Sequence, residues 1–211
     1  KSNPPFYKWY EDGVTNTCYN ALDIHIDQGN GKRIALIYDS PITGNKSKLT
    51  YEELKSKVAK FAGALRSQGA KKGDRIIIYM PMIPEAVIAM LACARIGAIH
   101  SVVFGGFASN ELASRIDDSK AKILVTASCG FEPGRTVEYK PLVDEAIKQA
   151  NHKIDKMILF QRSGHEVKLN AASEVSWDEV TSNAEEIDCV EMSSNEFAYI
   201  LYTSGTTGTP K

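Results

Sequence analysis

The stretch RIIIYMPMIPEAVIAMLACARIGAIHSVVF, residues 75–104, decides the fold of this chain. It begins and ends with short runs that are apolar on both alternating faces, the pattern of strands in a parallel sheet that is covered on both sides. Between these runs, Pro84 opens a stretch that is apolar around almost its whole circumference, which predicts a buried helix. A strand, a helix and a second strand with short connections predict a parallel βαβ unit with a right-handed crossover.

The same alternation continues on both sides of this stretch. Capping patterns at Thr50 with Glu53 and at Ser176 with Glu179, and a proline at position 141, predict further helices. Residues 39–48 predict a hairpin tip and residues 161–176 a polar loop. We expect an α/β fold with a mostly parallel sheet and helices on both faces, in which an N-terminal segment, residues 1–28, packs on a domain of residues 29–211. Further strands are predicted at residues 33–38, 122–127, 156–160 and 197–203.

The composition excludes several classes of protein. Of the 211 residues, 43% are hydrophobic and 24% are charged, and the formal net charge is −1. Such a chain has no basic field to concentrate nucleic acid, so we expect no nucleic-acid partner. The longest apolar helical stretch, residues 84–98, is too short to span a bilayer, so we expect no membrane insertion. The cysteines and histidines lack the spacing of ligand pairs, so we expect neither a metal site nor a disulfide framework.

The last ten residues, YTSGTTGTPK, predict an anion-binding loop. Two glycines permit close backbone approach, five hydroxyls add donors, and Lys211 supplies a cation. The loop follows an apolar run, so it would lie at the carboxyl end of a strand, where open α/β sheets bind ligands. The P-loop of nucleoside triphosphatases does not fit, because Pro210 stands where its second glycine would be. A flexible linker between domains is the alternative interpretation of this composition.

This terminal motif resembles the glycine-rich phosphate loop of the adenylate-forming superfamily. Residues 79–107, YMPMIPEAVIAMLACARIGAIHSVVFGGF, and residues 9–25, WYEDGVTNTCYNALDIH, are similar to the acetyl-CoA synthetase branch of that superfamily. Residues 132–146, EPGRTVEYKPLVDEA, look nearest to its propionate-preferring members. The resemblance implies an ATP-dependent short-chain acyl-CoA synthetase, which joins acetate or propionate to coenzyme A through an acyl-adenylate and releases AMP and pyrophosphate.

The resemblance also implies roles for individual residues. Residues 132–135 would hold the 3′-phospho-ADP end of coenzyme A, with Arg135 carrying the charge. Glu132 would turn outward or contribute only its backbone, since a carboxylate beside a phosphate is unfavourable. Magnesium would neutralise the charge of the ATP phosphates. The implied coenzyme A residues are Glu132, Pro133, Gly134 and Arg135, and the implied ATP-phosphate residues are Thr203, Ser204, Gly205, Thr206, Thr207, Gly208, Thr209 and Lys211.

The family's adenine, magnesium and acyl-pocket motifs and its C-terminal lysine lie beyond the phosphate loop, so the resemblance places no catalytic residue in this chain. We therefore expect the chain to end at a cut, with residues 209–211 poorly ordered, and to be inactive without the remainder of the protein. The resemblance implies the mitochondrial matrix for an animal protein and the cytoplasm otherwise. The alternative function is a non-catalytic nucleotide- or coenzyme A-binding module. Trp9 and Trp177 are predicted to be packing anchors.

Overall fold

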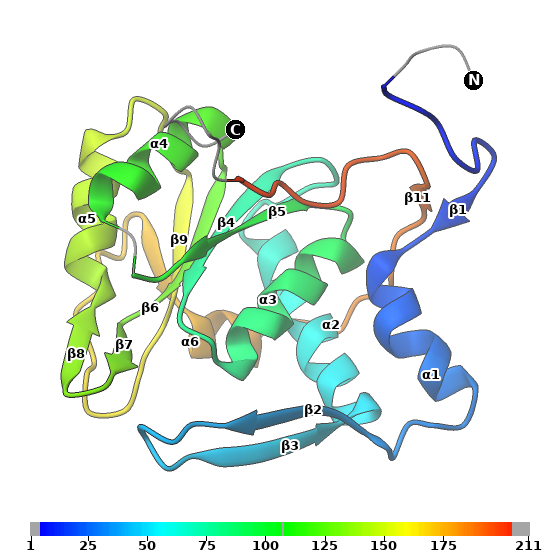
Figure 1. Ribbon diagram of the computed structural model, residues 1–211, viewed down its shortest axis with the longest axis horizontal. Helices are drawn as coiled ribbons and strands as arrows, with labels where there is room; N and C mark the ends of the chain where they lie inside the picture. Colours follow the sequence, from blue (N-terminus) through cyan, green and yellow to red (C-terminus); the bar gives the residue numbers. More distant parts are fainter. Residues whose placement is uncertain (1–4, 107, 204–211) are drawn as a thin grey trace.

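The computed structural model describes residues 5–106 and 108–203 (Figure 1). Its centre is a five-stranded sheet in which every neighbouring pair of strands is parallel. The strands are β4 (Arg75–Met80), β5 (Ile99–Phe104), β6 (Ile123–Ala127), β9 (Lys156–Phe160) and β10 (Glu174–Ser176). Their order across the sheet is β10-β9-β6-β4-β5. The runs at residues 75–80, 100–104, 122–127 and 156–160 are thus confirmed as strands of one parallel sheet.

Helices cover both faces of this sheet (Figure 1). One face carries α4 and α5, and the other carries α2, α3 and α6. The helices are α2 (Tyr51–Ser67), α3 (Pro84–Arg95), α4 (Ser109–Ser119), α5 (Tyr139–Gln149) and α6 (Trp177–Ser182). The predicted fold class is therefore confirmed. No helix in the described part of the chain is long and apolar enough to cross a membrane.

The helix starts agree only partly with the predicted caps. At the start of α2, Glu53 N–H donates to Thr50 Oγ1 at 3.2 Å, and Thr50 N–H donates to Glu53 Oε2 at 2.8 Å, so the capping box is confirmed. The second predicted box is wrong, because no side chain caps the start of α6 at Ser176. There the first turn is held by packing instead, since Trp177 is buried and stacks on Phe61 with 3.6 Å between ring centroids.

Two of the predicted strands are outside the parallel sheet. Residues 33–38 form β2 (Ile34–Asp39), which pairs antiparallel with β3 (Lys46–Thr50) in a separate hairpin. The apolar pattern was misleading here, because Ile37 is 66% exposed and the hairpin packs on α2 through one face only. The hairpin tip predicted between them is confirmed.

Residues 197–203 do not form a strand. They touch β5 through one bridge, in which Ile200 N–H donates to the His100 carbonyl at 2.9 Å. The chain then leaves β5 for α4, where the Tyr202 hydroxyl donates to Asp118 at 2.6 Å. Figure 1 shows this segment running beside β5 toward α4. Phe197 and Leu201 are largely exposed, so this apolar run is not covered by helices on both faces, as a strand of a parallel sheet would be.

The N-terminal segment lies against the end of α3. It contains β1 (Val14–Thr15), paired antiparallel with β11 (Met192–Ser193), then a π-helical turn (Tyr19–Asp23) and α1 (Ile24–Asp27). Cys18 and Leu22 are buried in the core. The prediction for Trp9 as a packing anchor is wrong, since its side chain is 72% exposed.

Candidate functional site

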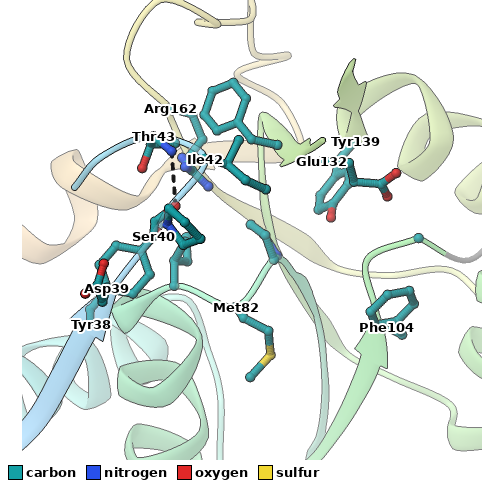
Figure 2. Close-up of a pocket in the computed structure, with 15 residues that line it drawn as sticks. Tyr38, Asp39, Ser40, Ile42, Thr43, Met82, Phe104, Glu132, Tyr139 and Arg162 are labelled. Carbon is teal, nitrogen blue, oxygen red and sulfur yellow. Dashed lines mark hydrogen bonds between the residues drawn. The ribbon is translucent and has the colours of Figure 1, made fainter. Parts of the chain in front are cut away.

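A reversal of chain direction across the sheet opens a cavity at the carboxyl ends of the strands. From β4 the chain passes through α3 to β5, and from β5 it returns through α4 to β6 on the other side of β4. The connections that follow β4 and β6 therefore leave toward opposite faces, and ligands of open parallel sheets bind at such a point. A cavity of about 300 Å³ lies there, lined by Met82 after β4 and by Glu132 and Tyr139 after β6 (Figure 2).

The tip of the β2–β3 hairpin forms the opposite wall of this cavity. Figure 2 shows Ser40 and Thr43 on one side and Glu132 and Tyr139 on the other. The N–H of Thr43 donates to Ser40 Oγ at 3.3 Å, which holds the tip in a tight turn. Exposed apolar side chains, among them Met82, complete the lining. An apolar wall with a few converging polar groups is the usual composition of a small-molecule site.

The predicted coenzyme A turn is the tip of a second hairpin at the rim of the cavity. Strands β7 (Cys129–Glu132) and β8 (Arg135–Glu138) pair antiparallel, and Glu132 faces Arg135 across the turn. Pro133 fixes a negative φ and Gly134 has a φ of +75°, the signs that a type II turn needs. The sequence EPGR therefore specifies a tight two-residue turn as well as a charged tip.

Glu132 lines the cavity, and its carboxylate pairs with Arg135, whose Nε and Nη2 lie 2.7 and 2.6 Å from Glu132 Oε2. The two side chains are 37% and 70% exposed, so water screens the pair and it contributes little to stability. An anion that approaches Arg135 must compete with this carboxylate.

Arg162 is the residue of the site that sequence reasoning missed. It follows the end of β9, is 9% exposed, and lines both the first cavity and a neighbouring cavity of about 460 Å³. Its guanidinium lies over the ring of Phe131, 4.7 Å from the centroid. Among residues 5–106 and 108–203, no carboxylate lies within ion-pair distance of it. A buried cation without an acidic partner, at the wall of a cavity, favours binding of an anionic ligand.

Tyr139 also lines the cavity, and two glycines make room for its ring. A Cβ atom at Gly105 or at Gly130 would collide with the Tyr139 ring. Gly105 is therefore required by packing. The ring of Tyr139 also packs against the ring of Tyr79, with 5.1 Å between the ring centroids. Burial, followed by the charge of Glu132, raises the pKa of Tyr139 to about 12. The phenol thus stays neutral throughout the physiological range.

Only the first residue of the predicted ATP-phosphate loop belongs to the described part of the chain. Of its residues only Thr203 is described, and it is not among the residues that line the cavity. Residues 204–211, including Thr209, Pro210 and Lys211 with their predicted poor order, lie outside the described residues. Just before them, Tyr202 is held against α4 by Asp118 and by the Arg115 guanidinium, 5.1 Å from its ring centroid.

The described residues contain one cluster of possible metal ligands, and it does not suit magnesium. Cys18, Asp23 and Cys189 bring two thiols and one carboxylate together, with the Arg95 guanidinium bonded to them. Magnesium requires oxygen ligands in an octahedral arrangement, so these residues do not form a magnesium site.

An open parallel sheet with a cavity at its switch point defines a class of α/β domains that bind ligands at the carboxyl ends of their strands. Within this class the family is identified by its own profile. The profile of the AMP-binding enzyme family matches residues 25–211, and the chain belongs to that family.

Comparison with known proteins refines this assignment. The chain is 54% identical over 209 residues to the mitochondrial acyl-CoA synthetase short-chain family member 3 of Rattus norvegicus, a match that covers 99% of the chain and 31% of the rat protein. It is 46% identical to the acetyl-coenzyme A synthetase of Streptomyces avermitilis, covering 100% of the chain and 32% of that protein. Among solved structures, acetoacetyl-CoA synthetase from Streptomyces lividans matches with a TM-score of 0.85 at 25% identity, covering 98% of this chain and 31% of that one. The chain thus spans about a third of the length of the curated relatives it matches.

Proposed function

We propose that this chain is part of an ATP-dependent, AMP-forming short-chain acyl-CoA synthetase that acts on acetate or propionate. The observation that carries the proposal is the cavity at the sheet switch point, with Arg135 at its rim and the buried Arg162 in its wall. The family match and the names of the relatives, which are acyl-CoA and acetyl-coenzyme A synthetases, support the type of reaction.

The proposed reaction has two halves. In the first, the substrate carboxylate attacks the α-phosphorus of magnesium-bound ATP, which gives an acyl-adenylate and pyrophosphate. Thr203 and residues 204–211 would bind the phosphates and stabilise the leaving pyrophosphate through hydroxyls, backbone N–H groups and Lys211. In the second half, the thiol of coenzyme A attacks the acyl carbonyl and AMP leaves.

The cavity serves the second half in this proposal. Asp39 and Glu132 in the lining are each paired with a cation, Lys46 and Arg135, which leaves the guanidinium of Arg162 to meet the phosphorylated end of coenzyme A. Arg162 is largely withdrawn from water, so its contact with a phosphate is weakly screened, whereas Arg135 must first be released from Glu132. The 3′-phosphate would then take the place of the Glu132 carboxylate on Arg135.

We further propose a division of the chain into residues 1–28, which pack on the domain, and residues 29–211, which form the α/β part of the AMP-binding domain. The partners proposed are small molecules, namely a short-chain carboxylate, ATP and coenzyme A, together with the rest of the synthetase polypeptide. The mitochondrial relatives support a matrix location if the protein comes from an animal.

The proposal is tested by isotope exchange with the full-length protein. Labelled pyrophosphate is mixed with ATP, magnesium and either acetate, propionate or butyrate, without coenzyme A. Incorporation of label into ATP that depends on acetate or propionate supports an acyl-adenylate, and addition of coenzyme A must then yield the thioester. Binding of ATP or coenzyme A without exchange for any acid would instead support a non-catalytic binding module.

A further inference from the structure

A cluster of two thiols, one carboxylate and one guanidinium lies at the C-terminal end of α3, away from the cavity. Cys18 comes from the N-terminal segment, Asp23 from the π-helical turn, and Cys189 from the segment that follows α6. The sulfur and carboxylate oxygen atoms lie within 4.8 Å of one another. Arg95, the last residue of α3, donates from Nη1 to Cys189 Sγ at 3.1 Å and to Cys18 Sγ at 3.5 Å.

The backbone holds the two cysteines next to each other. The Asn16 side-chain amide donates to the carbonyls of Val190 at 2.8 Å and Ala94 at 2.9 Å, so it ties both segments to α3. Asn16 Oδ1 accepts from the N–H of Cys18 at 2.8 Å, and Val190 N–H donates to the Arg95 carbonyl at 2.9 Å. The two sulfur atoms lie within 4.8 Å of each other, and a disulfide requires them to approach to roughly 2 Å.

The charges of the cluster favour a dithiol over a metal site. The Arg95 side chain is fully buried, and Asp23 already neutralises it through bonds of 2.8 and 3.0 Å. A metal cation bound by the thiols would meet this guanidinium at close range, which opposes binding. The same guanidinium stabilises a thiolate. The hydrogen bond from Cys189, followed by the hydrogen bond and charge of Arg95, lowers the pKa of Cys18 against the effect of its burial.

We propose that Cys18 and Cys189 form a reversible disulfide when a peroxide reaches them, a modification site that links the N-terminal segment to the segment after α6. Cys189 is half-buried and Cys18 is fully buried, so in this proposal the peroxide passes Cys189 to reach the Cys18 sulfur.

Oxidation of the two thiols to a disulfide consumes one molecule of peroxide. The Cys18 thiolate attacks a peroxide oxygen, the O–O bond breaks, and the departing hydroxide takes the proton of Cys189 and becomes water. The Cys189 thiolate then attacks the sulfur of the Cys18 sulfenic acid, the S–S bond forms and hydroxide leaves. Two electrons pass from the sulfur atoms to the peroxide, and a thiol reductant reverses the step.

The other two cysteines provide internal controls. Cys93 and Cys129 are buried, and burial raises the pKa of each thiol. Neither accepts a hydrogen bond from an arginine in the described residues, so both are expected to stay reduced under conditions that oxidise the pair.

The test uses the intact folded protein treated with hydrogen peroxide, then denatured, alkylated and digested for mass spectrometry. The expected result is a peptide pair joined through Cys18 and Cys189, lighter by two hydrogen atoms and lost on reduction, with Cys93 and Cys129 alkylated. Cys18→Ser and Cys189→Ser should each abolish the linked peptide, and Cys129→Ser should leave it unchanged. Separate alkylation of Cys18 and Cys189 after oxidation, sulfinic acids without the linked peptide, or a link to another cysteine would each overturn the proposal. The wild-type peptide map decides the question even if a serine variant fails to fold.

Discussion

Replacing Glu132 with glutamine should strengthen the binding of coenzyme A. In the structure, Glu132 occupies Arg135 through contacts of 2.6 and 2.7 Å, so an incoming phosphate must displace it. An exposed pair of this kind contributes about 0.2–1 kcal/mol, and removal of the carboxylate eliminates that competition. This free energy corresponds to a Kd for coenzyme A lower by a factor of about 1.5 to 5. This gain in affinity is the opposite of the usual result, in which changing a residue in a binding site weakens binding.

The assay is a calorimetric titration of the full-length Glu132→Gln variant with coenzyme A, followed by the KM for coenzyme A at saturating ATP and acid. Glu138→Gln is the matched control, because it removes the same charge from the same hairpin without touching Arg135 in the described structure. The gain should shrink as salt is added, because the interaction with an exposed arginine is screened. An unchanged or weaker affinity in a folded Glu132→Gln variant would refute the assignment of Arg135 as an anion ligand.

Three further predictions concern binding and stability. Arg162→Gln should raise the KM for coenzyme A about 10- to 150-fold, the equivalent of a lost charged hydrogen bond, and leave the KM for ATP unchanged; a rise in the KM for ATP alone would contradict it. Burial pushes the pKa of Asp23 upward, but the hydrogen bonds and charge of Arg95 outweigh this and hold the pKa below its ordinary value of 3.8. Asp23 therefore stabilises the fold above pH 3.8, and this contribution is lost as the pH falls through its folded pKa. Denaturant titrations should show that the free energy of unfolding of Asp23→Asn depends less on pH in the acid range than that of the wild type. At neutral pH the same variant should lose about 3–5 kcal/mol of unfolding free energy. Gly105→Ala should cost about 1–3 kcal/mol in thermal unfolding because its Cβ meets Tyr139, and the added change Tyr139→Leu should recover part of that loss.

The parallel sheet could be predicted from the sequence because its strands are buried on both faces. β4 and β6 are almost continuous apolar runs, and helical periodicity separates them from their neighbours. The run at residues 33–38 looks the same, but its partner is the strand across a tight turn, and composition does not reveal which partner a strand finds. The short strand β10 lay in a segment predicted as a polar loop, since three residues are too few to show a period.

The candidate site could be predicted only where residues that act together are close in sequence. The consecutive residues 132–135 could be singled out through their resemblance to the acetyl-CoA synthetase branch, and their role in binding coenzyme A stays a prediction. Arg162 was missed because only the fold brings it to Phe131, and a single arginine after a strand looks like an ordinary surface residue. Cys18 and Cys189 come from opposite ends of the chain, so spacing rules for cysteine pairs do not apply to them.

Product analysis of a single reaction mixture tests the central claim most directly. The full-length protein is incubated with ATP, magnesium, propionate and coenzyme A, and the nucleotides and thioesters are separated by chromatography. Our account predicts propionyl-CoA, AMP and pyrophosphate in equal amounts. Formation of the thioester together with ADP and phosphate would contradict it. So would binding of ATP and coenzyme A with no thioester formed, either from propionate or from acetate in a parallel mixture.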